Sequence, residues 1–462
     1  MVYTELTLPV NALRDEIDGT VIIPGDGDYD AARMAWNLAV DQYPALILIA
    51  ESAADVAAGV RYARSHDLGI AIQSTGHGVL LPANDCLLIM TSHLSAVSVD
   101  AASQTAWVEA GVLWGAVLEQ AQAVGLAPLL GSSSGVGAVG YTLGGGMGWL
   151  ARKYGLAVDS VLEFEVVTAD GQIVCASETE HSDLFWALRG GAKGALGVVT
   201  GMRIRLYEVT TVYGGSLIYS LADAREVFAF YREWIQYLPE EWTTSISIMN
   251  FPPMPELPPF LSGQSVVMVN GCYVGDAHLG QMMVQALPDW KQPIANTFHP
   301  MPFIESDTIS NDPMDPMPAS VSGGWLTDLS DETVETLLAY ATPDKVVKAE
   351  IRYAGGAIAR VNDAANAYDH RSSTLLLEAV GMTPTPEAVT QFRQHIAAFK
   401  QALQPHMTGG VYMNFLDGPD AHDQTANAFS AKKYQRLGEI KAKYDPENRF
   451  RFGYRIPTST EA

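Results

Sequence analysis

The stretch "KAEIRYAGG" carries three charged side chains whose types and spacing could support proton transfer. If residues 348–353 form a strand, its two-residue period places Lys348, Glu350 and Arg352 on one face. A carboxylate there could remove a proton from a substrate, and the guanidinium could orient that carboxylate or bind the substrate. The same alternation is also typical of a solvated strand face. We therefore predict Glu350 as a base and Arg352 as its partner if this face points inward.

A glycine-rich stretch is the second feature with chemical meaning. Residues 131–148, "GSSSGVGAVGYTLGGGMG", contain G-x-G-x-x-G at Gly135, Gly137 and Gly140, the spacing of a dinucleotide-binding turn. Such a turn follows a strand and opens a helix, whereas here a helical pattern ending at Gly125 precedes it and four more glycines follow. We predict a glycine-lined loop, which either lets backbone approach a ligand or is only a permissive turn.

Glycine also recurs in three other stretches, "QSTGHG", "YGLAVDSV" and "RGGAKGALGVVT". A fold that gathered all four stretches would present many backbone N–H groups to one ligand, which indicates a large phosphorylated cofactor. Taken alone, His77 in the first stretch reads as a hydrogen-bonded loop histidine.

The chain has two regions with different patterns of predicted helices and strands, and these elements would position the residues above. Residues 45–78 predict a strand, a helix that begins at Ser52 and a second strand, and 161–174 predict two strands around an Asp-Gly turn. From about residue 211, helices alternate with strands. The loops 251–259 and 298–318 are rich in proline and methionine and are either lids over a pocket or surface loops.

Composition narrows the classes of protein and partner. The 462 residues are 48% hydrophobic and 17% charged, which predicts a globular chain of two or three domains. A formal charge of -24 argues against nucleic acid or an anionic membrane as partner. The N-terminal residues lack the charged and apolar regions of a signal peptide, so we expect a cytoplasmic protein. Three cysteines without a C-x-x-C pair indicate neither a disulfide framework nor a cysteine metal site.

The motifs, taken in order, carry a family resemblance. The series "GH…GVGAVGYTLGGGMG…KYGLAVDSVL…VTADG…DLFWALRGG…GVVT…YEV", closed by "YMNF" and "KAKYDPENRF", resembles the flavin-linked oxidases of the vanillyl-alcohol-oxidase and berberine-bridge-enzyme type over nearly the whole chain. The resemblance implies an α+β, two-domain PCMH-type FAD-binding fold. The FAD-binding domain would comprise residues 1–210 and a C-terminal return at 420–462. Residues 211–419 would form an α+β substrate-binding domain, an antiparallel sheet flanked by helices.

The resemblance also implies FAD held covalently through His77, within a pyrophosphate loop that runs from Ser74 to Gly78. Many relatives make a second flavin bond through a cysteine where this chain has Ser133. A serine hydroxyl cannot replace a thiolate as nucleophile, so we expect one link, as in the branch that includes bacterial hydroxynicotine oxidases. The cofactor-binding residues implied are Ser74, Thr75, Gly76, His77, Gly78, Ser133, Gly137, Gly140, Tyr141, Gly144, Gly145, Gly148, Gly197, Val198, Tyr412 and Asn414.

Two further positions bear on catalysis by resemblance. Val136 stands at a gatekeeper position associated with access of dioxygen to the flavin, although valine also simply packs well there. Tyr141 stands near flavin N1 and O2, where a donor could stabilise reduced flavin, or it is a packed tyrosine with its hydroxyl at the surface. The residues with predicted catalytic roles are therefore Glu350, Arg352, Tyr141 and Val136.

The chain departs from the family pattern at two places. Ala195 and Leu196 replace the usual Asn-Phe pair, so cofactor contacts there would rely on backbone atoms. Phe415 replaces a tyrosine that serves as base in some branches, and phenylalanine cannot take a proton. The base must then come from elsewhere, with Glu350 preferred, or be unnecessary.

These observations predict an FAD-dependent oxidase. It would take a hydride from a C–H bond next to oxygen or nitrogen of a small organic substrate to flavin N5, and dioxygen would reoxidise the flavin to give hydrogen peroxide. The alternatives are a dehydrogenase of the same fold that uses another electron acceptor, and a flavin-bearing binding protein without turnover. The methionine and aromatic content of the possible lids favours a partly apolar substrate.

Overall fold

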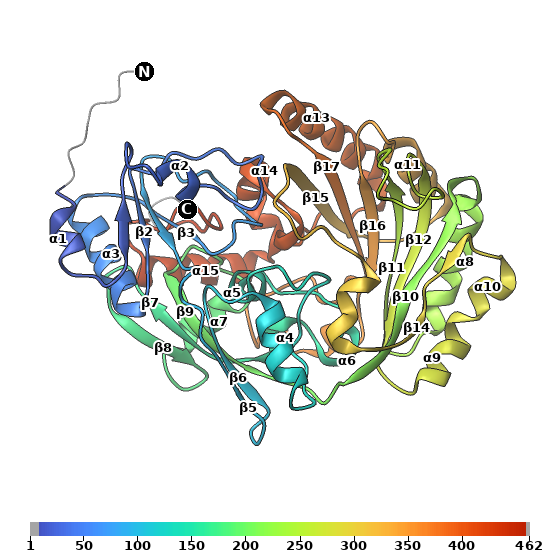
Figure 1. The fold of residues 1–462 in the computed structure, drawn as a ribbon, viewed down its shortest axis with the longest axis horizontal. Coiled ribbons are helices and arrows are strands. Elements are labelled where there is room, and N and C mark those ends of the chain that lie inside the picture. The colour runs from blue at the N-terminus through green and yellow to red at the C-terminus, as the bar shows by residue number, and fades with distance from the viewer. Residues whose placement is uncertain (1–8, 459–462) are drawn as a thin grey trace.

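The computed structural model describes residues 9–458, and Figure 1 shows them as two lobes lying side by side. The first lobe is built on strands β1 to β9 and the second on strands β10 to β17. The red C-terminal segment with α14 (Gly418–Asp423) and α15 (Ala431–Tyr444) returns to the first lobe, where α15 packs on α7 (Ser182–Leu188). This arrangement is the predicted α+β fold of two parts. The outermost residues of the predicted FAD-binding domain, 1–8 and 459–462, lie outside the described residues.

The first lobe contains two sheets. The smaller sheet has the order β1 (Thr20–Ile22), β2 (Leu46–Ile49), β4 (Leu87–Met90), β3 (Ile70–Gln73), and its last three strands are parallel. Helix α3 (Ala53–Ser65) connects β2 to β3 and begins at Ser52, whose side chain accepts a hydrogen bond from the Asp55 amide. The strand-helix-strand unit predicted for residues 45–78 is therefore confirmed. Because β3 ends at Gln73, the "STGHG" sequence emerges at the carboxyl edge of this sheet.

The second sheet of this lobe is antiparallel. Its order is β5 (Val97–Asp100), β6 (Thr105–Glu109), β9 (Val198–Arg205), β7 (Val161–Val167), β8 (Ile173–Ser177). Strands β7 and β8 form the hairpin predicted around the Asp-Gly turn. The other helices of the lobe are α1 (Asn11–Arg14), α2 (Tyr29–Ala32), α4 (Trp114–Gln122), α5 (Ala138–Leu143) and α6 (Ala151–Tyr154).

The prediction of a continuous loop over residues 131–148 is wrong at its centre, because α5 occupies part of it. Ala138, Val139, Thr142 and Leu143 are buried, so tertiary packing favours a helical turn that the flanking glycines disfavour locally. The helix ends before Gly145, whose φ of 114° few other residues would adopt. The incoming chain nevertheless arrives from helix α4 and not from a strand, as predicted.

The second lobe is one large antiparallel sheet. Its order is β13 (Ala295–Asn296), β10 (Thr211–Ser220), β12 (Ser265–Tyr273), β11 (Trp242–Asn250), β16 (Lys348–Tyr353), β17 (Leu375–Met382), β15 (Ala319–Leu326), and β14 (His299–Pro302) also pairs with β10. Helices α8 (Ala224–Trp234), α11 (Asp331–Tyr340) and α13 (Pro386–Leu403) share a hydrophobic core with one face of this sheet. Shorter helices are α9 (Ala277–Val284), α10 (Ala286–Trp290) and α12 (Ala357–Arg360).

The orientation of β16 follows from this core. Ala349 and Ile351 pack under the helices, so the alternating Lys348, Glu350 and Arg352 face the opposite side of the sheet, toward the first lobe. One Arg352 N–H donates to the carbonyl of Met147 in the first lobe at 3.2 Å. The condition that this charged face points inward is met.

Within residues 9–458, the structure contains no helix long and apolar enough to cross a membrane.

Candidate functional site

A cavity of about 960 Å³ lies between the two lobes. Loops after β3 and around α5 line it from the first lobe, and the charged face of β16 and β17 lines it from the second. The predicted site residues that border it are Ser74, Thr75, Gly76, His77, Gly78, Ser133, Val136, Gly137, Gly140, Tyr141, Gly197, Arg352 and Asn414. Those that lie behind its wall are Gly144, Gly145, Gly148, Val198, Tyr412 and Glu350.

The glycines behind the wall allow close packing. A Cβ at Gly144 would overlap the side chain of Asn414, and one at Gly148 would overlap the carbonyl of Leu130. Gly140 differs, because a Cβ there would meet no atom within 4 Å and Gly140 borders the cavity. Small size at Gly140 therefore keeps cavity space open, whereas at Gly144 and Gly148 it lets protein segments touch.

Tyr412, behind the cavity wall, forms hydrogen bonds to residues of that wall. Its hydroxyl accepts hydrogen bonds from the amides of Gly146 at 3.0 Å and Met147 at 3.1 Å. The amide group of Asn414 donates to this hydroxyl at 3.2 Å and to the carbonyl of Tyr141 at 2.9 Å. The other end of that amide, Asn414 Oδ1, is buried and has no hydrogen-bond partner. Tyr412 thus orients Asn414 at the edge of the cavity.

The loop at 74–78 presents unsatisfied donors to the cavity. Its backbone N–H groups donate to no other described residue, and the buried hydroxyl of Ser74 likewise has no partner. Gly76 has φ of 83°, and a Cβ there would come within 2.6 Å of Ala35. Consecutive free amides at the end of a strand are suited to bind an anion.

His77 is held in one orientation at this loop. Its ring stacks on Trp36 with centroids 4.1 Å apart, and its Nδ1 lies 2.8 Å from Thr75 Oγ1. Burial, aided by the positive charge of Lys193, lowers the pKa of His77 to about 4. The imidazole is therefore neutral near pH 7, as a nucleophilic nitrogen requires.

The opposite wall carries a buried cluster of charges. Lys348 Nζ lies 2.7 Å from a Glu378 carboxylate oxygen and 3.4 Å from Glu350, and Arg352 lies 3.1 Å from Glu350. Glu378 stands on β17 directly opposite Glu350 on β16 and borders the cavity, whereas Glu350 lies beneath it. Sequence reasoning missed Glu378. The available signal was a carboxylate within the otherwise apolar run "LLLEAVGM".

The two carboxylates differ in proton affinity. Burial raises the pKa of Glu350, but the charges of Arg352 and Lys348 outweigh burial and leave that pKa below its ordinary value. Burial also raises the pKa of Glu378, and there the same two cations do not fully offset it, so the pKa stays above its ordinary value. The charge of Glu350 adds to this rise. Glu378 is thus the more basic carboxylate and the one that the cavity exposes.

Two aromatic residues complete this end of the cavity. The guanidinium of Arg352 lies 4.7 Å from the ring centre of Phe415. Phe415, which has no group that can accept a proton, therefore packs against this cation. The Tyr141 hydroxyl is buried without a partner, and burial raises the pKa of Tyr141 well above its ordinary value. Tyr141 is therefore a protonated donor with no acceptor among residues 9–458.

Both proline- and methionine-rich loops contribute to the cavity wall. Met254 and Leu257 come from the first loop, and residues 310–317 come from the second. The second loop is tied to the first lobe, since the Trp36 indole donates to the carbonyl of Met314 at 3.1 Å. The Ser133 hydroxyl contacts Met314 Sδ at 3.4 Å. The two loops therefore supply apolar surface from their methionine, leucine and proline side chains, and the second loop adds the carboxylates of Asp312 and Asp315 to the same wall.

These features fit a flavin dinucleotide. Free amides and the Ser74 hydroxyl suit phosphate oxygens, and Gly140 leaves room beside the wall. Tyr141 and Asn414 also border the cavity, and each carries a buried polar atom without a partner that a polar ring edge could satisfy. In the part of the chain that the structure describes, no cluster of three or more potential ligands could hold a metal ion.

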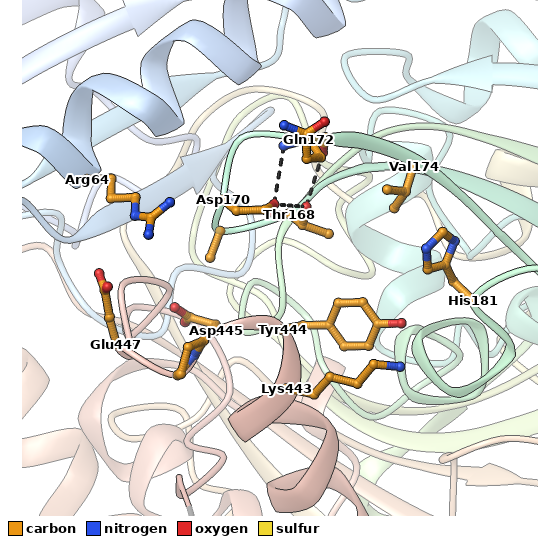
Figure 2. A pocket seen from close by; sticks show the side chains of 12 residues that line it. Arg64, Thr168, Asp170, Gln172, Val174, His181, Lys443, Tyr444, Asp445 and Glu447 are labelled. Atoms are coloured by element: carbon orange, nitrogen blue, oxygen red, sulfur yellow. Dashed lines mark hydrogen bonds between the residues drawn. The ribbon is translucent and has the colours of Figure 1, made fainter.

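A second cavity of about 430 Å³ lies elsewhere in the first lobe, between the β7–β8 turn and the end of α15 (Figure 2). Several of its polar groups are engaged with the protein. Asp170 accepts hydrogen bonds from the Thr168 hydroxyl and the Gln172 amide (Figure 2). Lys443 pairs with Asp183 at 2.6 Å. None of the predicted site residues borders this cavity, so it is not the candidate site.

Comparison with known proteins agrees with the fit to FAD. Residues 44–177 match the family model of an FAD binding domain, and residues 411–457 match the model for berberine and berberine-like proteins. The FAD-linked oxidoreductase YgaK of Bacillus subtilis is 27% identical over 456 residues, which cover 96% of this chain and 98% of that protein. The (R)-6-hydroxynicotine oxidase of Paenarthrobacter nicotinovorans is 38% identical over 195 residues, 42% of each chain.

Solved structures share the whole fold. The 6-hydroxy-D-nicotine oxidase of Arthrobacter nicotinovorans superposes with a TM-score of 0.83 at 25% identity, over 95% of this chain and 98% of that one. BBE-like 1 of Physcomitrella patens superposes with a TM-score of 0.83 at 23% identity, over 97% of this chain and 98% of that one. The predicted PCMH-type fold is thereby confirmed. The chain is an FAD-dependent oxidoreductase, and its matched segments and whole fold are similar to those of the vanillyl-alcohol-oxidase and berberine-bridge-enzyme family.

Proposed function

We propose that this protein is an FAD-linked oxidase of small, partly apolar organic molecules, with its cofactor attached through His77. The observation that carries the proposal is one cavity bordered by a neutral histidine with free loop amides on one side and a buried carboxylate-cation cluster on the other. We assign cofactor binding to residues 1–210 with 420–462 and substrate binding to 211–419. The separate sheets of the two lobes support this division.

FAD, when bound, supplies the redox chemistry: it accepts a hydride at N5 from a C–H bond next to oxygen or nitrogen and passes the electrons to dioxygen, which yields hydrogen peroxide. His77 supplies the nucleophilic nitrogen for attachment. Its Nδ1 lies next to Thr75 Oγ1, which leaves Nε2 as the nitrogen that forms the bond. Ser133 offers no thiolate, so we expect a single covalent link.

The base is the carboxylate pair of the second lobe. Glu350 remains a predicted base, but the geometry favours Glu378, because it borders the cavity and keeps a raised pKa. In this assignment Glu378 takes the substrate proton, and Lys348, whose Nζ lies 2.7 Å from the Glu378 carboxylate, holds that carboxylate in place. Beneath it, the charges of Glu350 and Arg352 balance each other. Phe415 takes no part in proton transfer.

Other residues position the reactants. Tyr141 and Asn414 border the cavity and carry a buried hydroxyl and a buried amide oxygen without partners, and we assign these groups to the polar edge of the flavin ring. Val136 borders the same cavity and leaves space for dioxygen at its predicted gatekeeper position. Met254, Leu257, Met314 and Met317 give the substrate apolar contacts, while Asp312 and Asp315 of the second loop keep part of the enclosure polar.

The proposal is tested with purified protein. We expect a yellow protein that stays yellow after acid precipitation, and release of hydrogen peroxide with at least one member of a panel of amines, alcohols and sugars. Anaerobic reduction by that substrate followed by rapid mixing with air distinguishes an oxidase from a dehydrogenase. Slow reaction with air but fast reaction with a quinone would identify a dehydrogenase. A bound flavin that no substrate bleaches would indicate a binding protein and overturn the oxidase assignment.

A further inference from the structure

Lys193 is a half-buried cation that the proposed reaction does not use. It lies in the segment 189–197, the part of the chain that departs from the family pattern, and its side chain borders the cavity on the His77 side. Its Nζ would stand 3.0 Å from a Cβ placed on Gly78. The ammonium is therefore next to the last amide of the donor loop 74–78. The carbonyl of Lys193 accepts the Tyr454 amide at 3.0 Å, which anchors the backbone beneath this side chain.

No carboxylate among residues 9–458 forms an ion pair with this ammonium. Burial lowers the pKa of Lys193 to about 8, and no carboxylate opposes that effect. The other lysine of the cavity, Lys348, is different, because Glu378 and Glu350 pair with it. A charge that is partly removed from water and has no partner is unfavourable, so an anion that binds beside this ammonium stabilises the site. The free amides of the loop beside it add hydrogen-bond donors for the same anion.

We propose that Lys193 binds the diphosphate of FAD, in concert with the amides of residues 74–78. This inference rests on the proposed FAD site and adds a charged contact to it. Backbone amides donate hydrogen bonds to a phosphate but carry no net charge. A lysine ammonium carries a full positive charge, so one lysine can offset part of the negative charge of the diphosphate. The contact would account for how this chain holds the cofactor without the Asn-Phe pair at Ala195 and Leu196.

The proposal predicts a proton linkage. In flavin-free protein Lys193 loses its proton above about pH 8, and a bound diphosphate would raise its pKa. Between the two pKa values, binding takes up a proton, so FAD affinity must fall as pH rises through this range. The titratable neighbour His77 stays neutral throughout, because its own pKa is about 4. Riboflavin, which lacks phosphate, should show no such dependence.

The experiment uses full-length protein in a His77→Ala background, so that flavin binding is reversible. FAD and riboflavin are titrated into flavin-free protein, with affinity and proton uptake measured by calorimetry in buffers of different ionisation enthalpy. Lys193→Met should weaken FAD binding by about 30-fold or more, the scale for losing one partner of a buried charge pair, and leave riboflavin binding unchanged. Lys432→Met is the matched control, since it removes the same charge from an exposed site on α15.

The outcomes separate two failures. Equal loss of FAD and riboflavin affinity in Lys193→Met, or unchanged FAD affinity with unchanged proton uptake, overturns the diphosphate contact while the flavin site stands. Failure of the His77→Ala protein to bind either flavin overturns the flavin site and the contact together. Selective loss of FAD affinity, with loss of proton uptake near pH 9, supports the contact.

Discussion

Replacing Glu378 with glutamine removes the proposed base while it keeps nearly the same shape at the cavity wall. The carboxylate lies 2.7 Å from Lys348 Nζ, and an amide oxygen can accept a hydrogen bond from the same ammonium. We therefore expect the fold and bound flavin to survive. A positioned general base contributes about 10²- to 10⁴-fold, so flavin reduction should slow by that factor, or about 2.7 to 5.4 kcal/mol in the barrier.

The pH profile gives a second readout that a merely structural effect would not produce. Glu378 must be ionised to accept a proton, and its pKa lies above the ordinary glutamate value. The acidic limb of kcat/KM in the parent enzyme should therefore lie at higher pH than an exposed glutamate would give, with activity lost as pH falls through it. Glu378→Gln should abolish this limb. The assay is anaerobic stopped-flow reduction of the flavin across a pH series.

Glu350→Gln separates the two carboxylates. Glu350 lies behind the wall, and its charge helps to raise the pKa of Glu378. Its neutralisation should shift the acidic limb to lower pH without abolishing it, and reduction should slow less than in Glu378→Gln. Glu387→Gln, at an exposed position in the first turn of α13, controls for the change in net charge. If Glu378→Gln retains both the reduction rate and the limb, the assignment of the base is refuted. If Glu350→Gln alone abolishes the limb, Glu350 is the base.

Three further changes test other parts of the molecule. His77→Ala should lose its colour on acid precipitation, and peptide mapping of the parent should find one flavin-bearing peptide because Ser133 forms no thioether; a second such peptide would contradict this. Gly140→Val should block flavin loading by filling cavity space, measured as flavin bound per protein, and full loading would show that the flavin lies elsewhere. Arg371→Met should lower the free energy of unfolding by about 3–5 kcal/mol, because it strands the buried Asp159 that lies 2.7 Å away, and an unchanged urea midpoint would show that the pair contributes little.

Much of the fold was predictable because it follows from local patterns. The periodicity of residues 45–78 specifies a strand, a helix and a strand without reference to distant residues, and the helix begins at Ser52 as its capping pattern indicates. Alternation likewise placed Lys348, Glu350 and Arg352 on one face. Short-range periodicity cannot show where packing overrides propensity, which is why α5 was missed.

The family and its cofactor were readable from the order of glycine-rich motifs, since glycine is required wherever backbone must adopt positive φ or approach another group closely. By itself the sequence thus determined the class of enzyme and the histidine loop. Only the tertiary structure decided which face of β16 is inward, because this depends on Ala349 and Ile351 packing under helices from distant segments. Strand register likewise set Glu378 opposite Glu350, and the turn at Lys193 placed its charge beside the donor loop. These contacts are between residues far apart in the chain, and no local sequence pattern predicts them.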